Sequence, residues 1–152
     1  MKFEIQSFEG ALPLRFGMSP ADVSGILGSP NTAAPNWKRV LCYHYNPPPL
    51  DVTVGFGGDD QTADHFGFGR HALVCFRGLD FFCDRSAWRN LLDQSSDYHE
   101  CLGFLVFCDL GIALTGFHDD YEDELAVTAF PRDAWEKFRP KFKPFELTRN
   151  AS

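Results

Sequence analysis

Long hydrophobic runs are missing from this sequence. None of its apolar stretches approaches the roughly 20 residues that a membrane-spanning helix needs. The opening MKFEIQSFEG alternates charged and apolar residues, whereas a secretory signal peptide would place an apolar core there. The sequence therefore predicts a cytoplasmic protein that does not associate with a membrane.

The cysteines lack any pairing pattern. Their number, five, is odd, none belongs to a C-x-x-C pair, and each is flanked by aromatic or aliphatic residues. Such cysteines are typical of reduced thiols that pack like small hydrophobic side chains, and they argue against a disulfide framework or a zinc site. They are Cys42, Cys75, Cys83, Cys101 and Cys108.

Positive charge is scarce and confined to one end. The formal net charge is -7, yet residues 132–149 carry six basic side chains against three acidic ones. A nucleic-acid-binding protein needs a basic face that displaces counterions from phosphates, and the acidic body cannot provide one. We therefore predict no nucleic-acid partner, and the acidic body favours a basic protein partner instead.

Sequence motifs for catalysis are also lacking. The glycines of GFGGDD, residues 55–60, have neither the lysine nor the following helix of a phosphate-binding loop. None of the five histidines stands in a nucleophile motif, and Cys101 in YHEC is predicted to point toward the core. We predict no catalytic residue and no cofactor, while a small hydrolase or metal-dependent enzyme with a site between two repeats remains the alternative.

The clearest structural signal is the segment RFGMSPADVSGILGSP, residues 15–30. Ser19 is a good N-cap, Pro20 suits the first helical position, and Asp22 places a carboxylate where the helix dipole favours it. Gly28 and Pro30 then end the helix after about two turns. The segment predicts a short amphipathic helix.

Alternating strands follow this helix. KRVLCYHY and LDVTVGF, residues 38–45 and 50–56, predict a hairpin, and HFGFGRHALVCF, residues 65–76, predicts two further strands. The second half has the same order. A helix capped by Asp84 is expected through residues 85–94, and residues 101–117 form another predicted hairpin.

The third predicted element of each half, which is the second strand of its hairpin, supports an internal repeat. Leu50, Val52 and Val54, followed by Asp59-Asp60, stand 60 positions before Leu110, Ile112 and Leu114, followed by Asp119-Asp120. We predict an α+β single domain over residues 1–152, built from repeats at about 10–76 and 77–130. A C-terminal helix and tail, 131–152, is expected to pack on the body through Trp135 and Phe138, with its basic residues facing the acidic body.

The phrase FGMSPADVSGILGSP resembles the opening of a bacterial module in which a helical start precedes a small antiparallel sheet. It is similar to the small lipoproteins that help to assemble outer-membrane proteins, and to the beta-lactamase inhibitory protein family, which uses two such modules in tandem. The resemblance implies a sheet face that clasps another protein, as in cytosolic immunity proteins that silence bacterial toxins. The chain departs from the lipoproteins, because it has no N-terminal lipidated cysteine.

An acidic turn is the strongest charge feature. In GFHDDYEDEL five of the six residues from Asp119 to Glu124 are carboxylates. The spacing does not fit a calcium loop, because Tyr121 holds the third position and Glu124 the sixth when Asp119 is the first. His118 with its neighbours does not form a predicted metal site, because adjacent residues of an extended chain point in opposite directions. A solvated turn and a docking patch for a basic partner both stay open.

Aromatic residues complete the predicted binding surface. Tyr43 and Tyr45 share one face of a strand, and they line either an open sheet surface together with Trp37 and Tyr121 or the core of the protein. Both interpretations stay open, and the first makes these aromatic residues candidate anchors for a partner. The function predicted from the sequence is a non-enzymatic, immunity-type inhibitor that binds a basic toxin or effector, with self-association of the chain as a further alternative. The candidate partner-binding residues are Trp37, Tyr43, Tyr45, His118, Asp119, Asp120, Tyr121, Glu122, Asp123 and Glu124.

Overall fold

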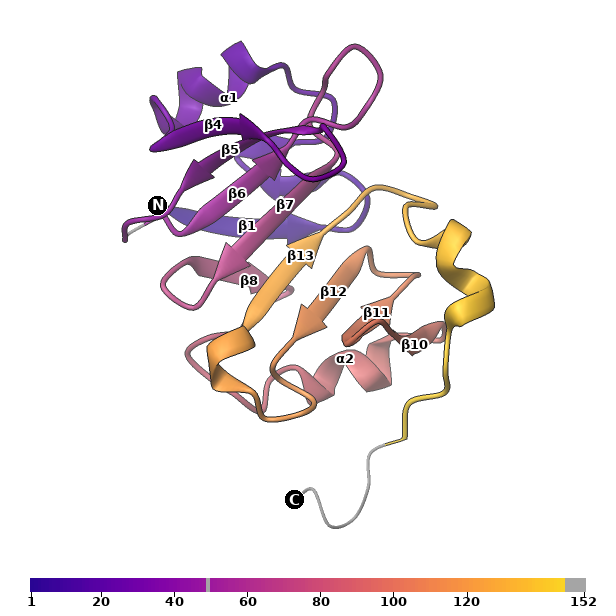
Figure 1. The fold of residues 1–152 in the computed structure, drawn as a ribbon. Helices are drawn as coiled ribbons and strands as arrows, with labels where there is room; N and C mark the ends of the chain where they lie inside the picture. The colour runs from indigo at the N-terminus through magenta and orange to yellow at the C-terminus, as the bar shows by residue number, and fades with distance from the viewer. Residues whose placement is uncertain (49, 147–152) are drawn as a thin grey trace.

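The computed structural model describes residues 1–48 and 50–146. These residues form an α+β fold with two sheets, which confirms the predicted fold class. In Figure 1 the larger sheet faces the viewer, with the strands β1 and β8 of the smaller sheet and the helix α2 behind it. None of the helices in the described residues combines the length and apolarity needed to cross a bilayer.

The large sheet has eight antiparallel strands in the order β10-β11-β12-β13-β7-β6-β5-β4. Both predicted hairpins, β5 with β6 and β11 with β12, are present in it. The two groups of four strands join where β13 pairs with β7, side by side at the middle of the sheet in Figure 1. The strands are β4 (Thr32–Pro35), β5 (Leu41–Tyr45), β6 (Val52–Gly55), β7 (His65–Gly69), β10 (Tyr98–Cys101), β11 (Phe104–Phe107), β12 (Ile112–Thr115) and β13 (Ala126–Ala129).

The small sheet has the order β3-β2-β1-β8-β9, and β1 runs parallel to β8 at its centre. Both strands predicted within residues 65–76 exist, but only β7 stays in the large sheet, because β8 pairs with the N-terminal strand. The small sheet consists of β1 (Lys2–Gln6), β2 (Gly10–Leu12), β3 (Leu14–Arg15), β8 (Leu73–Phe76) and β9 (Leu79–Asp80).

Helix α1 (Pro20–Leu27) matches its prediction in detail. Ser19 Oγ accepts a hydrogen bond from the Asp22 backbone N–H, and the Asp22 carboxylate accepts one from the Ser19 N–H, both at 3.1 Å. This reciprocal pair is a capping box, which satisfies two N–H groups that a helix start leaves without partners. Gly28 ends the helix with a φ of 85°.

The predicted start of the second helix is wrong. Helix α2 covers only Arg89–Gln94, and Asp84 does not cap it. The Asp84 carboxylate accepts hydrogen bonds from the backbone N–H and the hydroxyl of Ser86, at 3.0 and 2.8 Å. Because the carboxylate is used by a residue two positions on, residues 84–88 form successive turns before the helix begins.

The C-terminal segment is less helical than predicted. Residues 132–135 form a turn, and the 3-10 helix η2 (Glu136–Lys141) follows it. Pro140 lies inside η2, and its lack of an N–H disfavours a regular α-helix there. A second 3-10 helix, η1 (Glu122–Glu124), lies in the acidic turn. Arg149, counted in the basic tail, lies outside the described residues.

The two halves have the same element order, a short helix followed by four antiparallel strands. The segments offset by 60 residues become β6 and β12, each the third strand of its group. The duplication itself and the predicted repeat boundaries stay predictions, because sharing an order of elements does not establish a common origin.

One face of the large sheet, called here the inner face, packs on the small sheet and both helices. Val54, Phe66 and Leu114 from the sheet, Phe3 from β1 and Leu91 from α2 belong to the same buried cluster. Of the cysteines, Cys42, Cys75 and Cys101 are buried as predicted. Cys83 is exposed and Cys108 half-buried, which corrects the expectation for those two thiols.

Candidate functional site

The outer face of the large sheet carries one continuous row of side chains across all eight strands. Strand pairing places each member of the row directly opposite the next. Because side chains alternate between faces along a strand, registered partners lie on the same face. The row reads Thr32, His44, Thr53, Gly67, Thr128, Ala113, Val106 and His99.

The end of the row near β10 is covered by the C-terminal segment, residues 131–145, called the tail here. Val106 and Ala113 are fully buried under Trp135, Phe138 and Phe142, which pack against them in a second apolar cluster. Trp135 meets Phe104 edge to face, with 5.2 Å between the ring centroids. The predicted packing of the tail through Trp135 and Phe138 is therefore confirmed. We call this region the covered half-face.

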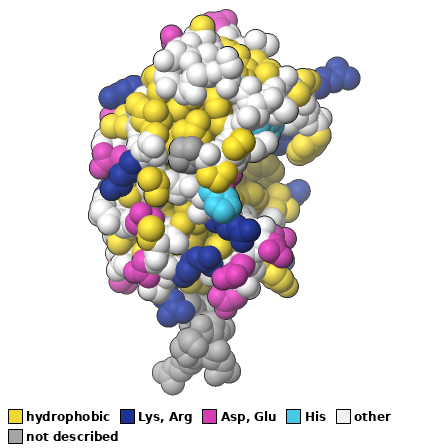
Figure 2. Space-filling model, turned by 90° about the vertical axis from the view of Figure 1, so that its left-hand side faces the viewer, with side chains coloured by type: hydrophobic (Ala, Val, Ile, Leu, Met, Phe, Trp, Pro, Cys, Tyr) yellow, Lys and Arg dark blue, Asp and Glu magenta, His cyan; other side chains and the backbone are white. Residues whose placement is uncertain are grey.

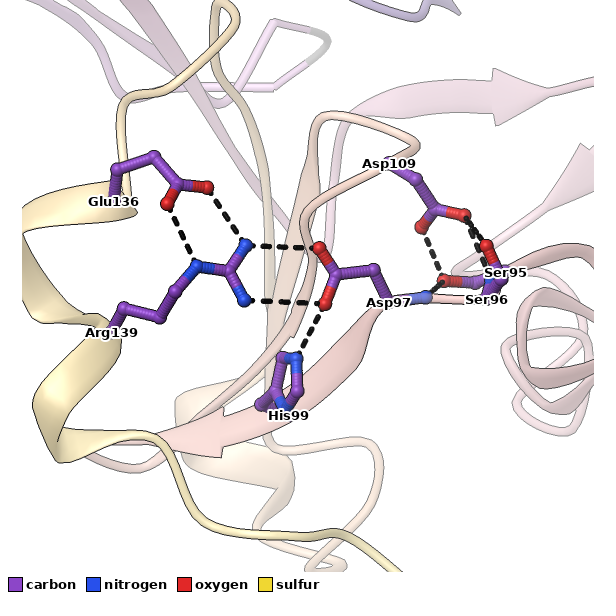
Figure 3. A network of polar contacts seen from close by, with 7 residues as sticks. All are labelled: Ser95, Ser96, Asp97, His99, Asp109, Glu136 and Arg139. Atoms are coloured by element: carbon purple, nitrogen blue, oxygen red, sulfur yellow. Dashed lines mark hydrogen bonds and ion pairs between the residues drawn. The ribbon is translucent and has the colours of Figure 1, made fainter.

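An ion pair between Arg139 and Asp97 joins the tail to the body, as Figure 3 shows. The Arg139 guanidinium donates to the Asp97 carboxylate at 3.0 Å and to Glu136 within the tail at 2.7 Å. These contacts confirm, for Arg139, that a basic tail residue faces an acid of the body. The hydrogen bond from Arg139 lowers the pKa of Asp97, despite partial burial of that carboxyl.

Two further contacts hold this region in place. His99 Nε2 lies 2.6 Å from Asp97 Oδ1, and its ring stacks on Phe142 at 4.8 Å. Lys143 and Glu100 exchange backbone hydrogen bonds of 2.8 Å in both directions, so the tail adds one bridge to the edge strand β10. The tail therefore closes this edge of the sheet as well as its outer face.

Asp109 stabilises the turn that leads into β10. It accepts hydrogen bonds from the Ser95 hydroxyl and, at 2.8 Å, from the Ser96 backbone N–H (Figure 3). Burial by itself raises the pKa of Asp109, but the bonds from Ser95 and Ser96 outweigh it, so the net pKa is lowered. This carboxylate stabilises the local structure in its charged form.

The other end of the row is uncovered, and we call it the open half-face: His44, Thr53, Gly67 and Thr128. All four residues are half-buried. His44 Nδ1 lies 3.1 Å from Thr53 Oγ1, so these two polar side chains satisfy each other. Apart from Gly67 itself and its two chain neighbours, no heavy atom of the described residues lies within 4 Å of the place where a Cβ on Gly67 would be, so the backbone is open to a close approach there.

Trp37 stands at the rim of the open half-face. It lies in the turn between β4 and β5 and is 87% exposed. The Lys38 ammonium lies 4.8 Å from the Trp37 ring centroid and 5.8 Å from that of Phe138 in the tail. Lys38 thus lies between the exposed indole and the tail. Trp37 is accessible, and its role in partner binding stays a prediction.

The two predicted tyrosines are on the wrong side of the sheet for partner binding. Tyr45 is 2% exposed, and its hydroxyl donates to the Gly28 carbonyl at 2.9 Å. Tyr43 packs edge to face on Phe56, at 4.9 Å, against the main core. The predicted alternation is correct, but the tyrosines lie on the buried inner face and not on the open face. The reason is that α1 covers the face that carries them.

The acidic turn lies at the end of the strands opposite to Trp37. Strand β13 begins at Ala126 beside Gly69, the last residue of β7, whereas the turn with Trp37 lies near the start of β7. Asp119, Asp120, Tyr121, Glu122, Asp123 and Glu124 are all exposed, and His118 is half-buried. The predicted anchors therefore do not form one patch.

Nearby basic side chains offset part of the negative charge of the acidic turn. Arg85 donates to Glu122 at 3.0 Å. The view in Figure 2 shows acidic and basic side chains interspersed over the lower part of that face. The turn thus adds negative potential near one end of the sheet without forming a uniform acidic field.

Three cavities are relevant to catalysis. The one that we call the larger cavity, about 500 Å³, is lined by His118, Arg85 and Asp120 among others, but by no cysteine. A second, about 440 Å³, is lined by Cys101, whose pKa is raised by burial. A third, about 250 Å³, contains Cys108, whose pKa is raised to about 11 by burial and by the nearby Asp97 charge. Thiols with a raised pKa stay protonated at neutral pH and are weak nucleophiles, so neither supports a cysteine hydrolase.

Metal ligands are not brought together either. Within residues 1–48 and 50–146, no three His, Cys, Asp or Glu side chains form a group that could hold a metal ion. His118 Nδ1 is enclosed and has no hydrogen-bond partner among the described residues, and its ring meets Phe145 at 5.7 Å. Cation binding by His118 with the acidic turn therefore has no geometric support.

Comparison of the chain with known protein families, with curated proteins and with solved structures finds no match. The functional argument therefore depends on the geometry of the outer face. The residues that make up the open half-face were not among the predicted site residues. The signal that could have found them is the period of two in VTV and VTA, where threonine separates residues of the inner face.

Proposed function

We propose that this protein is a non-enzymatic protein-binding module that receives a basic protein partner on its open half-face. The observation that carries the proposal is the unequal burial of the outer face: the tail buries Val106 and Ala113 completely, whereas Thr53, Gly67 and Thr128 are half-buried and the space above Gly67 is open. A pleated surface of small side chains allows a partner to approach the backbone closely. An immunity-type inhibitor of a toxin or effector, acting in the cytoplasm, is the specific form that we propose.

Two features beside the open half-face suit such a partner. Trp37 is an exposed indole, and tryptophan is enriched among residues that dominate binding energy because it buries much area with little loss of entropy. The net charge of -7, with five exposed carboxylates in the acidic turn, attracts a basic protein over several ångströms. The open half-face would provide a surface complementary in shape to the partner, and the negative charge would accelerate association with it.

The test uses three forms of the protein as bait in pull-downs from the native lysate. In the first variant Thr53→Arg and Thr128→Arg fill the open half-face. In the control variant Ala21→Arg and Ser29→Arg change the net charge equally at exposed positions of the α1 region. We expect a basic protein that the wild type and the control retain and the first variant loses. Retention of every captured protein by the first variant would exclude this face as the binding site.

The acidic turn can be tested once that partner is purified. Neutralising Asp119, Asp120, Glu122, Asp123 and Glu124 to their amides should lower the association rate constant about tenfold or more and flatten its salt dependence. The measurement is stopped-flow or surface-plasmon-resonance kinetics at several ionic strengths. An unchanged association rate would assign the turn to solvation alone, while leaving the role of the open half-face to the first test.

A further inference from the structure

The larger cavity has an apolar floor and a charged rim. Its floor consists of Trp88, Phe117 and Leu125, which are 4%, 5% and 7% exposed. Its rim includes Arg85 and Glu122, whose side chains are 48% and 71% exposed, and the exposed Asp120. Its volume of about 500 Å³ falls in the usual range for small-molecule sites. An occupant would bury its apolar part and keep its charges near solvent.

Both signs of charge meet at this rim. Arg85 and Arg89 come from the segment before and at the start of α2, whereas Asp120 and Glu122 come from the acidic turn. The Arg85 guanidinium and the Glu122 carboxylate lie 3.0 Å apart, so the two segments approach each other across the cavity mouth. A ligand with one charge gains one partner at this mouth and meets a like charge, whereas a zwitterion gains a partner for each of its charges.

We propose that this cavity binds a free α-amino acid with a hydrophobic side chain. Its carboxylate pairs with the Arg85 side of the rim, its ammonium group with the Asp120 side, and its side chain packs on Trp88 and Phe117. The two charges of such a ligand stand on one carbon atom, which matches charges confined to the rim above an apolar floor. Arginine pairs well with carboxylates because its planar guanidinium can donate two parallel hydrogen bonds.

The site is separate from the protein-binding face. It lies between the acidic turn and the segment that leads into α2, and none of the residues of the open half-face lines it. The acidic turn nevertheless contributes two of its carboxylates to the cavity. A bound amino acid would therefore contact a turn that the proposed protein partner also approaches.

The decisive experiment is isothermal titration calorimetry with the wild-type protein and a matched set of ligands. Phenylalanine and leucine are the zwitterions; 3-phenylpropionate keeps only the carboxylate, and phenethylamine keeps only the ammonium group. We expect saturable one-to-one binding of the amino acids and affinities at least about tenfold lower for both single-charge analogues. Absence of binding by the amino acids, or equal binding of an analogue, would overturn the proposal.

Two substitutions and two controls locate the site. Arg85→Gln and Asp120→Asn should each lower the affinity for phenylalanine about tenfold, while Arg77→Gln and Asp59→Asn, outside the cavity lining, should leave it unchanged. Asparagine suits position 120 because that residue has a φ of 58°. Amide chemical-shift changes should cluster in residues 85–89 and 116–125. Shifts that centre on Thr53, Gly67 and Thr128 instead would refute the assignment to this cavity.

Discussion

The two halves of the outer face differ in how their strands are buried. In β6 and β7 the buried valines and phenylalanines alternate with half-buried residues at Thr53, His65, Gly67 and Gly69, although Gly55 at the end of β6 is buried. In β11 and β12 consecutive residues are buried, because the tail covers the outer side chains as well. One half of the sheet is thus packed on its inner face alone, whereas the other half is packed on both faces, between the core and the tail.

The chemistry of the outer positions explains this difference. Val106 and Ala113 would expose apolar surface if the tail were absent, whereas Thr53 and Thr128 carry hydroxyls that can pair with a neighbouring polar side chain, as Thr53 does with His44, or with water. The tail supplies aromatic rings where the sheet is apolar, and the ion pair between Arg139 and Asp97 helps to hold it in position. The open half-face needs no cover for stability, which makes it available for binding.

The largest effect should come from placing a charge at equivalent positions of the two halves. Val106→Asp buries an unpaired carboxylate under the tail and should lower the free energy of unfolding by more than about 3 kcal/mol. Thr128→Asp, in the same cross-strand row, keeps its charge hydrated and should cost less than about 1 kcal/mol. Urea denaturation of both variants measures the difference. Equal losses would show that the two half-faces are covered alike.

Truncating the two outer tryptophans should give an intermediate effect. Trp135→Ala removes ring contacts with Phe104 and Phe130 and should lower the free energy of unfolding by about 2 kcal/mol, less than a fully buried ring because Trp135 is half-buried. Trp37→Ala should stay within about 0.5 kcal/mol of wild type, because that side chain is exposed. Thermal and urea unfolding provide the comparison. A large stability loss in Trp37→Ala would mean that its ring packs on the body.

The smallest expected effect concerns the ion pair of the tail and its dependence on pH. Asp97 has a pKa below its usual value of 3.8, chiefly because Arg139 donates to it. Its charged form therefore stabilises the fold above about pH 4, and that stabilisation is lost as the pH falls through the lowered pKa. Asp97→Asn should cost on the order of 1 kcal/mol at pH 7, after allowance for solvent screening, and nothing at the lowest pH.

Asp59→Asn is the matched control for that titration, because Asp59 is exposed and makes no side-chain contact with the tail. Its unfolding free energy should follow that of the wild type at every pH. A difference between wild type and Asp97→Asn that persists at the lowest pH would mean that the tail does not depend on the charge of Asp97.

Much of the local structure could be predicted from the sequence. Ser19, Pro20, Asp22 and Gly28 specify α1 because a capping box and a C-terminal glycine act over a few residues. The hairpin β5–β6 follows from alternation, and the hairpin β11–β12 from two short apolar runs separated by a turn. The start of α2 was wrong because Asp84 could bond either to a helix N–H or to Ser86, and pattern alone does not choose between two local hydrogen bonds.

The site was predicted less well. Trp37 is exposed as expected, but Tyr43 and Tyr45 face the core, because alternation defines two faces without saying which one the helices cover. The unbroken apolar run FLVF at residues 104–107 was a usable sign that both faces of β11 are buried. The contrast between this unbroken run and the alternating VTV of β6 distinguishes the covered half-face from the open half-face.

The sequence by itself determined the α+β class, the caps of α1, the period of the strands and the acidity of residues 119–124, because each of these depends on neighbours within a few positions. Only the tertiary structure decided that β8 joins the N-terminal strand, that β7 pairs with β13, and that the tail covers Val106 but not Thr128. Those choices depend on apolar area buried between segments far apart in the chain, which no local pattern encodes.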